Sequence, residues 1–374
     1  MMITKHLFYT PKLDLDVGES IAATVGYETY GRLNPTHTNA ILICHYFSAN
    51  GHAAGRYHPD DESTGWWDAL IGSGKAFDTD RYFVIAVDSL CNLNVNTPLV
   101  VTTGPSTINP TTGRPYGTTF PQITIRDNVR LQHQLLVSLG IERLVCVAGP
   151  SMGGFQALEW AVTYPQVPAR VIAAVSSHYA SPVFALAICQ AGIDTIQADP
   201  AWAGGDYYGT EGPLGGLTRA AAVMTTLCRS DAWINWSWER KTAIGSPLPW
   251  ADREGRFAFQ AEMEQLARSR AQVYDANHFI WIARACILHD IGHGYGGLEA
   301  AAQRIKADVL MLPVASDLVF RPEGNAEFVQ TVRQQGGRAD MAVIDSPNGH
   351  LAGVFEAARF TEPIVSFLNR GHLH

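Results

Sequence analysis

The chain has 374 residues, of which 47% are hydrophobic and 17% charged, and its formal net charge is −8. This composition is typical of a globular protein with a sizeable core and excludes a disordered chain. Lys and Arg form no block, so the sequence lacks the basic footprint that nucleic acid or an anionic membrane surface would require.

The N-terminal 18 residues contain no apolar run of the kind found in signal peptides, and no stretch of about 18 uninterrupted apolar residues occurs. We therefore expect a cytoplasmic enzyme that does not contact a membrane. The cysteines are scattered without C-x-x-C pairs, so they indicate neither a zinc site nor a redox motif, and no disulfide framework is expected. They are Cys44, Cys91, Cys146, Cys189, Cys228 and Cys286.

Short apolar runs without polar alternation recur along the chain, as in strands that are buried on both faces of a parallel sheet. The predicted strands are residues 40–44, 82–87, 143–148, 170–175, 309–314 and 341–344. Between them lie helical patterns, such as residues 127–139 and 155–164. Strands that alternate with helices predict an α/β fold with a doubly wound, mostly parallel sheet.

The pattern changes after about residue 181. From there to about residue 293 the sequence is helical in character and rich in tryptophan, and the strand pattern then returns. We therefore predict a core domain formed by residues 1–180 and 294–374. A helical lid domain, residues 181–293, is expected to be inserted into it.

The segment from Gly149 to Gly154 fits the G-x-S-x-G pattern, with Ser151 at its centre. It follows a predicted strand and precedes a predicted helix, the context in which this motif marks the nucleophile of an α/β-hydrolase fold. A sharp turn there exposes the serine hydroxyl, and the helix N-terminus that follows offers N–H groups to an oxyanion.

A serine nucleophile needs a base that is itself oriented by an acid, and on this fold the chain order is Ser, then Asp or Glu, then His. Asp317 and His350 each follow a predicted strand in that order. They are therefore the expected acid and base, because open α/β sheets place their sites at the carboxyl ends of strands. Asp345 is a rival acid, although it lies very close to His350 in the chain.

The oxyanion is expected to accept hydrogen bonds from the N–H groups of Phe47, in the loop after an early strand, and Met152, which follows the nucleophile. His45 and His52 flank that loop and could line the pocket. The i, i+4 spacing of His289 and His293 could suggest a metal face, but the H-E-x-x-H pattern is missing. Surface or capping roles are therefore preferred for this pair, and no metal site is expected.

Several sequence blocks, in one order and over nearly the whole chain, resemble the homoserine O-acetyltransferase family of α/β hydrolases. They include G-W-W-D at residues 65–68, D-T-D-R-Y-F at 78–83, T-G-P-S at 103–106, S-M-G-G at 151–154, D-P-A-W at 199–202 and Y-D-A-N at 274–277. The resemblance implies acetyl transfer from acetyl-CoA to an amino-acid hydroxyl through an acyl-serine, usually in a homodimer with a helical lid. It also implies Ser151, Asp317 and His350 as the triad.

The chain departs from this family at charged positions. Family members usually carry an arginine in the first lid helix that holds the carboxylate of the amino acid, and Ile193 stands there. They usually carry aspartate directly after the catalytic histidine, near the substrate ammonium, and Leu351 stands there. A charge-assisted hydrogen bond contributes about 1.5–3 kcal/mol, so losing both contacts would weaken homoserine binding by orders of magnitude.

Hydrolysis of short-chain carboxylic esters through an acyl-Ser151 intermediate is therefore the preferred hypothesis. The alternative is an acetyl-CoA-dependent homoserine (or serine) O-acetyltransferase. A catalytically silent binding protein is a third reading, which the full set of triad residue types opposes. We expect Tyr46 and Leu351 to contact the substrate. No cofactor is expected, and acetyl-CoA would enter only as an acyl donor.

Overall fold

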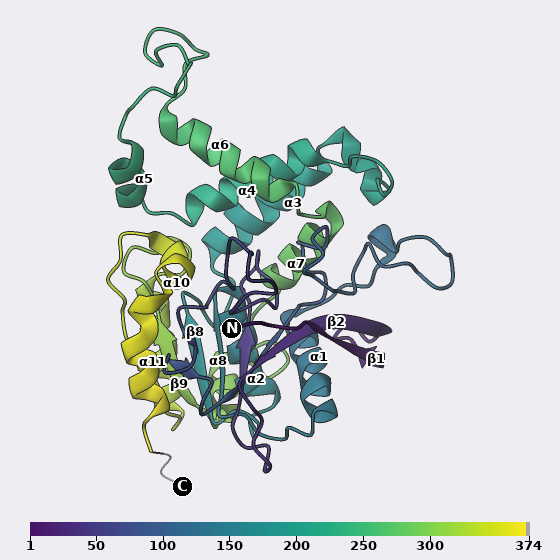
Figure 1. Cartoon of the computed structure of the whole chain (residues 1–374), viewed down its shortest axis with the longest axis vertical. Helices are drawn as coiled ribbons and strands as arrows, with labels where there is room; N and C mark the ends of the chain where they lie inside the picture. Colours follow the sequence, from purple (N-terminus) through teal and green to yellow (C-terminus); the bar gives the residue numbers. More distant parts are fainter. Residues whose placement is uncertain (372–374) are drawn as a thin grey trace.

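The computed structural model describes residues 1–371 and contains an eight-stranded sheet with helices on both faces (Figure 1). The strand order is β1-β2-β6-β3-β7-β8-β9-β10. Strands β3, β6, β7, β8, β9 and β10 run parallel, whereas β2 pairs antiparallel with both β1 and β6. The strands are β1 His6–Asp14, β2 Ser20–Tyr30, β3 Ala40–Cys44, β6 Phe83–Val87, β7 Cys146–Pro150, β8 Arg170–Ala174, β9 Asp308–Leu312 and β10 Ala339–Met341; β4 Ile71–Gly72 and β5 Phe77–Asp78 form a separate small ladder.

The central strands are buried on both faces because their side chains alternate between two hydrophobic clusters. In β3, Leu42 and Cys44 belong to one cluster, while Ile41 and Ile43 belong to the other. Helices α1, α2, α8 and α9 contribute to the first cluster, and α11 contributes to the second. These core helices are α1 Ile125–Ser138, α2 Met152–Thr163, α8 Leu298–Arg304, α9 Pro322–Gln334, α10 Ala352–Phe355 and α11 Thr361–Leu368.

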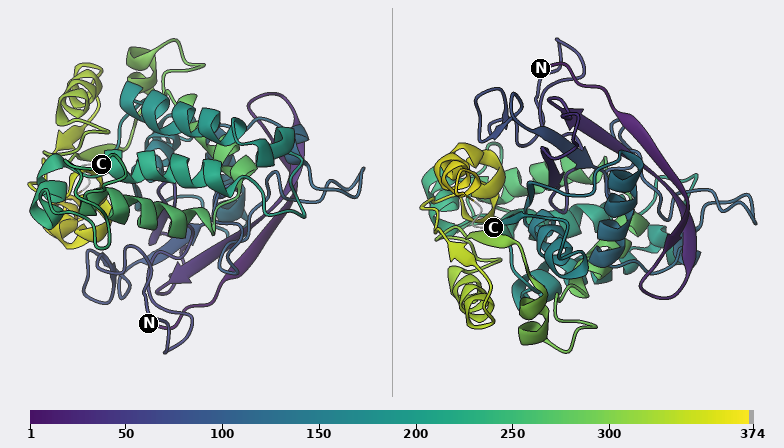
Figure 2. Two further views of the ribbon diagram at one scale, coloured as in Figure 1. Left: turned by 90° about the horizontal axis from the view of Figure 1, so that it is seen from above. Right: turned by 90° about the horizontal axis from the view of Figure 1, so that it is seen from below.

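Residues 181–293 fold into helices that lie over the carboxyl ends of the parallel strands; seen from above, several run side by side (Figure 2, left). They comprise a π-helical stretch, η2, four α-helices that cross or flank the top, and α7 beneath them. Their bounds are η2 Val183–Gln190, α3 Ala191–Gln197, η3 Pro200–Gly205, α4 Leu214–Leu227, α5 Asp231–Trp238, α6 Ala258–Ala271 and α7 Ala276–Ile287. Both η2 and α7 share the first hydrophobic cluster with the sheet.

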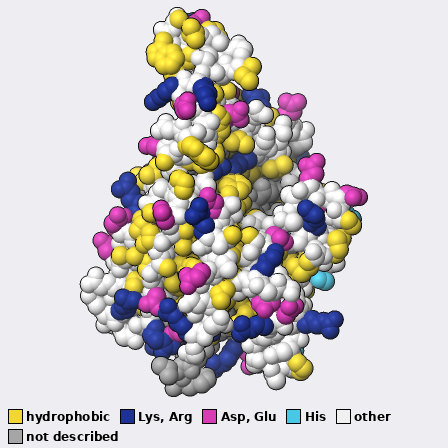
Figure 3. Space-filling view, turned by 60° about the vertical axis from the view of Figure 1, so that its left-hand side comes forward, with side chains coloured by type: hydrophobic (Ala, Val, Ile, Leu, Met, Phe, Trp, Pro, Cys, Tyr) yellow, Lys and Arg dark blue, Asp and Glu magenta, His cyan; other side chains and the backbone are white. Residues whose placement is uncertain are grey.

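The far end of these helices carries exposed hydrophobic side chains. The loop between α5 and α6 projects at the top of Figure 1, and yellow side chains gather at the corresponding tip in Figure 3. Trp236, Ile244, Leu248 and Trp250 are all more than half exposed. Within residues 1–371, no helix is both long and apolar enough to cross a bilayer.

The predicted α/β class with a mostly parallel sheet is confirmed. All six cysteines are buried and free. The strand expected at residues 143–148 runs over Cys146–Pro150, and two further features differ from expectation. The β1–β2 hairpin was not predicted, because β1 is mostly exposed and has no apolar run. The last strand covers Ala339–Met341 rather than residues 341–344; beyond Met341, Ile344 forms an isolated bridge to Val314.

Candidate active site

Ser151 occupies a sharp turn between β7 and α2. Its backbone has φ 56° and ψ −121°, a left-handed conformation that side chains other than glycine rarely adopt. The turn is held by hydrogen bonds from Ser151 N to Ala174 O (2.9 Å) and from Ser176 Oγ to Ser151 O (2.8 Å). The strained residue is thus fixed at the carboxyl end of the central strands, with its hydroxyl at the end of the sheet that the lid helices cover.

Two glycines next to Ser151 are required by close packing against β3. A Cβ atom at Gly153 would lie 2.1 Å from the Cys44 carbonyl oxygen, and one at Gly149 would lie 2.4 Å from the same atom. No side chain fits at either distance, since both clashes are with backbone in the middle of the sheet. The G-x-S-x-G spacing therefore lets the nucleophile turn approach the neighbouring strand.

A chain of hydrogen bonds runs from Asp317 through His350 to Ser151. His350 Nδ1 lies 2.9 Å from Asp317 Oδ2, and His350 Nε2 lies 3.0 Å from Ser151 Oγ. With Nδ1 donating its proton to the carboxylate, Nε2 is free to accept the serine proton. All three side chains are buried, at 2–6% exposure, which keeps water away from the hydrogen bonds.

Asp317 is fixed by its own loop as well as by His350. Its Oδ1 accepts hydrogen bonds from Val319 N (2.7 Å) and Phe320 N (3.2 Å). The rival acid Asp345 is exposed and makes no contact with His350 among the hydrogen bonds of residues 1–371. The structure therefore brings Asp317, and not Asp345, to the imidazole.

The loop after β3 carries Phe47 to the site. Within the described part of the chain, neither Phe47 N nor Met152 N donates a hydrogen bond to a protein acceptor. Buried backbone N–H groups are rarely left without an acceptor, so these two are suited to bind an oxyanion. The Phe47 ring packs edge-on against Phe184 of η2 and Phe279 of α7, which fixes the loop beneath the lid helices.

The two histidines of this loop support it and do not act as bases. His45 Nε2 accepts from Ser89 N (3.0 Å), and its Nδ1 lies 2.8 Å from Tyr46 O. Burial lowers the pKa of His45 to about 4, so its imidazole stays neutral. His52 Nδ1 lies 3.0 Å from the buried carboxylate of Glu28.

The structure places apolar side chains at the two positions where the family resemblance implies charges. Ile193 of α3 is buried in the first hydrophobic cluster. Leu351 is also buried, and its N–H donates to Cys228 O (3.2 Å). Tyr46 is partly buried beside Trp66, with ring centroids 5.5 Å apart, and burial raises its pKa to about 12. It therefore remains a neutral hydroxyl next to the Phe47 loop.

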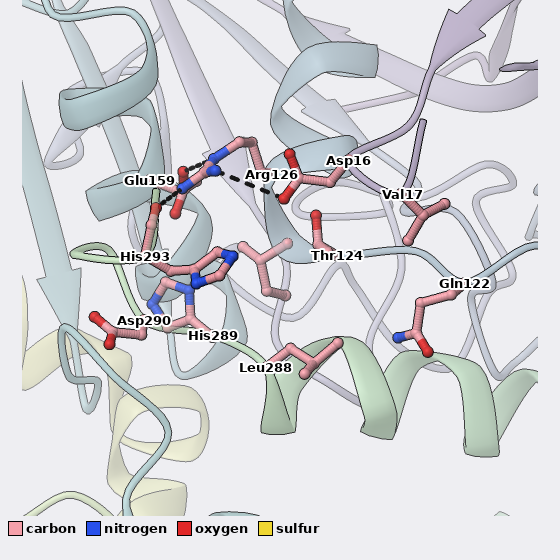
Figure 4. A pocket seen from close by; sticks show the side chains of 11 residues that line it. Asp16, Val17, Gln122, Thr124, Arg126, Glu159, Leu288, His289, Asp290 and His293 are labelled. Carbon is pink, nitrogen blue, oxygen red and sulfur yellow. Dashed lines mark hydrogen bonds and ion pairs between the residues drawn. The ribbon is translucent and has the colours of Figure 1, made fainter. Parts of the chain in front are cut away.

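His289 and His293 line a separate cavity of 230 Å³ between the start of α1, α2 and the segment after α7 (Figure 4). Arg126 crosses this cavity to pair with Glu159 (2.6 Å) and Asp16 (3.6 Å). The preference for surface or capping roles was wrong for His289, because it is buried and stacks on Phe155 at 4.2 Å. Both histidines follow α7, so their i, i+4 spacing does not place them on one face of a helix. Residues 1–371 contain no cluster of three or more potential metal ligands.

Two residues near the site were not found from the sequence. Arg229 follows α4, and Arg270 lies at the end of α6, where its Nη1 donates to Thr225 Oγ1 (2.9 Å). The segment Cys228–Ser230 packs directly on the His350 loop, because Ser230 Oγ donates to Pro347 O. Nothing in the local sequence marks these arginines, since their position depends on how the lid helices cross the sheet.

Comparison with known proteins adds three findings. Residues 39–357 match the family model described as alpha/beta hydrolase fold. A homoserine O-acetyltransferase from Symbiobacterium thermophilum is 42% identical over 359 residues, which cover 95% of this chain and 91% of the relative. Among solved structures, a homoserine O-acetyltransferase from Bacillus anthracis superposes with a TM-score of 0.95 at 39% identity, covering 99% and 98% of the two chains. An esterase superposes with a TM-score of 0.93 at 37% identity, covering 98% and 100%.

Proposed function

Because the chain belongs to the alpha/beta hydrolase family and, within it, to the homoserine O-acetyltransferase family, we propose that it transfers short acyl groups through an acyl-enzyme on Ser151. The observation that supports this role is the hydrogen-bonded chain from Asp317 Oδ2 through His350 to Ser151 Oγ. A nucleophile, a base and an orienting acid in that arrangement are sufficient for acyl transfer by this route.

In the first half-reaction, Ser151 Oγ attacks the carbonyl carbon while its proton moves to His350 Nε2. The oxyanion accepts hydrogen bonds from Phe47 N and Met152 N. As the tetrahedral intermediate collapses, the bond to the leaving group breaks, and His350 returns the proton to the departing oxygen or sulfur. In the second half-reaction, His350 takes a proton from the acceptor hydroxyl, whose oxygen attacks the acyl carbonyl; the bond to Ser151 Oγ then breaks, and His350 returns the proton to Ser151 Oγ. No bound cofactor takes part in either step.

The acceptor decides the net reaction. The names of the similar proteins favour acetyl transfer from acetyl-CoA to the hydroxyl of homoserine over the ester hydrolysis that the sequence analysis preferred. We therefore place acetyl transfer to a homoserine-like hydroxyl first. Relatives 37–42% identical over 95–98% of this chain carry that name, which supports a shared acyl-enzyme half-reaction and a shared class of acceptor.

Short-chain ester hydrolysis is the second candidate, and a specific observation favours it. Leu351 and Ile193 are buried apolar residues at the places where charges would hold a zwitterionic acceptor. An acceptor that binds weakly leaves the acyl-enzyme to water. The esterase that superposes over the full length supports the view that this scaffold accommodates hydrolysis.

The deciding experiment measures turnover of acetyl-CoA by purified protein with and without homoserine, beside hydrolysis of p-nitrophenyl acetate. Release of CoA that rises steeply with homoserine supports transfer, whereas ester cleavage that homoserine leaves unchanged supports hydrolysis. Ser151→Ala is expected to lower kcat in both assays by about five to six orders of magnitude. Ser138→Ala, a control on α1 remote from the site, should leave both unchanged. A Ser151→Ala protein with wild-type turnover would exclude the acyl-Ser151 route.

We expect the enzyme to act as a homodimer, in which a second copy covers exposed apolar side chains of α5 and of the loop between α5 and α6, namely Trp236, Ile244, Leu248 and Trp250. Light scattering coupled to gel filtration would measure the mass in solution. Trp236→Glu together with Trp250→Glu should then convert dimer to monomer, while a wild-type protein that is already monomeric would contradict the proposal.

A further inference from the structure

The loop after β3 lies against the start of α2, beside the nucleophile turn. A Cβ atom at Gly153 would come within 3.2 Å of the His45 carbonyl oxygen. The loop then makes a tight turn, in which Ala49 N donates to Tyr46 O (3.0 Å). Phe47, whose N–H group is one of the two expected oxyanion donors, is the second residue of this turn. The direction of that N–H group therefore depends on how the turn is held.

The peptide that carries the Phe47 N–H group is fixed through its carbonyl. Tyr46 O accepts hydrogen bonds from Ala49 N and from His45 Nδ1, which lies 2.8 Å away. Nδ1 is the donor of this imidazole, because Nε2 of the same ring accepts from Ser89 N (3.0 Å). In a planar trans peptide the N–H group points opposite to the carbonyl. The Phe47 N–H group is thus directed away from the bonds that close the turn, and it has no protein acceptor within the described part of the chain.

Two asparagines of the segment after β6 hold the end of this turn. Asn92 Nδ2 donates to Ala49 O (2.9 Å). Asn94 Nδ2 donates to Ser48 O (3.0 Å) and to Ala49 O (3.2 Å). Asn94 N donates to Asn92 Oδ1 (3.0 Å), and only amino groups can face the carbonyl oxygens of the turn, so the orientation of both amides is fixed. Both side chains are buried, at 1% and 7% exposure, which keeps water from competing for these hydrogen bonds.

A third asparagine of the same segment is bonded to the lid instead. Asn96 Nδ2 donates to Tyr274 O (3.0 Å), just before α7. Among the hydrogen bonds of the described residues, Asn96 makes none to the loop after β3. Asn92 and Asn94 therefore contact the loop that carries Phe47, whereas Asn96 contacts only the inserted helices, and the two kinds of contact can be changed separately.

We propose that Asn92 and Asn94 are positioning residues of the oxyanion hole. By holding Ala49 they keep the turn closed, and the closed turn keeps the Phe47 N–H group directed at the oxyanion that forms on the substrate. The proposal rests on the acyl-Ser151 function above and deepens it. Donors that are already oriented stabilise a developing charge more than donors that must reorient during the reaction, so two buried amides at this place have a catalytic consequence.

The test compares p-nitrophenyl acetate with its thionoester, in which sulfur replaces the carbonyl oxygen. In both compounds Ser151 Oγ attacks the carbon, and p-nitrophenol leaves with the proton that His350 returns. Sulfur accepts hydrogen bonds more weakly than oxygen, so the thionoester is stabilised less by the oxyanion donors. The ratio of kcat/KM for the two esters therefore reports the oxyanion hole. This ratio does not depend on how much of a variant is folded, because misfolded protein lowers both rates equally.

Asn92→Ala and Asn94→Ala are each expected to lower kcat/KM for the oxygen ester about 10- to 100-fold, which is part of the loss that follows removal of an oxyanion donor. The thionoester should lose less, so the ratio should narrow. Asn94→Asp keeps the shape of the side chain without its N–H donors and should narrow the ratio as Asn94→Ala does. Asn96→Ala is the matched control on the same segment and should leave the ratio unchanged.

An unchanged ratio in Asn92→Ala and Asn94→Ala would overturn the positioning role, even where both rates fall. An equal narrowing in Asn96→Ala would overturn it as well, since the effect would then arise from the contact with the lid. Failure of the proposed function gives a different result. In that case the wild-type protein would release p-nitrophenol from neither ester, or Ser151→Ala would release it as fast as wild type.

Discussion

The sheet and the lid contribute differently to the surroundings of Ser151. On the sheet side, Ser151, His350 and Asp317 are bonded to one another, and Asp317 also accepts two backbone N–H groups. On the lid side, Arg229 and Arg270 carry charge that no described acid balances. The sheet side is complete without a substrate, while the lid side is not. From this difference we expect the strand ends to set the chemistry and the lid to influence the choice of substrate.

The largest expected effect on the sheet side comes from changing the orienting acid, Asp317. Asp317→Asn is expected to lower kcat for p-nitrophenyl acetate by about four orders of magnitude, because the imidazole loses the partner that fixes its tautomer. Asp345→Asn is the matched control, since Asp345 is the rival acid and is exposed. Comparable losses in both variants would contradict the assignment of Asp317.

The second test concerns the rigidity of the sheet side. Gly153→Ala would place a methyl group 2.1 Å from the Cys44 carbonyl oxygen, so we expect the free energy of unfolding to fall by about 3 kcal/mol. Gly324→Ala on α9 meets no atom within 4 Å and should raise it by roughly 0.5–1 kcal/mol. Urea denaturation measures both, and equal stabilities would show that the turn is not tightly packed on β3.

A third test addresses the acceptor directly. Leu351→Asp adds a carboxylate beside His350, and we expect it to raise homoserine-dependent release of CoA about 10- to 100-fold by binding the ammonium group. Leu351→Asn has a similar shape without the charge and should give little increase. An unchanged response in the aspartate variant would show that the acceptor ammonium does not approach this position.

The last test concerns the pH dependence of the fold. Burial lowers the pKa of His45 and of His178 to about 4 and that of His289 to about 3. Unfolded histidine binds a proton near pH 6.5, so unfolding takes up protons and stability is lost as the pH falls from about 6.5 towards about 4.

His289→Phe tests one of these groups, because phenylalanine keeps the stack on Phe155. It should reduce the slope of unfolding free energy against pH by up to about 1.4 kcal/mol per pH unit in that range. Denaturation at several pH values provides the slope, and an unchanged slope would mean that His289 is protonated in the folded protein.

The sheet side could be predicted from sequence because its signals are local. Strands buried on both faces appear as continuous apolar runs, and the order of Ser151, Asp317 and His350 follows from the topology. The β1–β2 hairpin lacked such a signal because it lies at the exposed edge of the sheet. Arg229 and Arg270 come from separate helices, and only the crossing of α4 and α6 brings them together, which no local pattern encodes.

The hydrophobic cluster shared by the lid and the sheet limits how a substrate can enter. Phe184 of η2 and Phe279 of α7 are buried against Phe47, and swinging the inserted helices away would return such rings to water at about 1.5–3 kcal/mol each. A hinged opening of the whole segment is therefore opposed by this shared cluster. We therefore expect substrates to enter without displacement of the whole lid, and turnover should accordingly be insensitive to solvent viscosity.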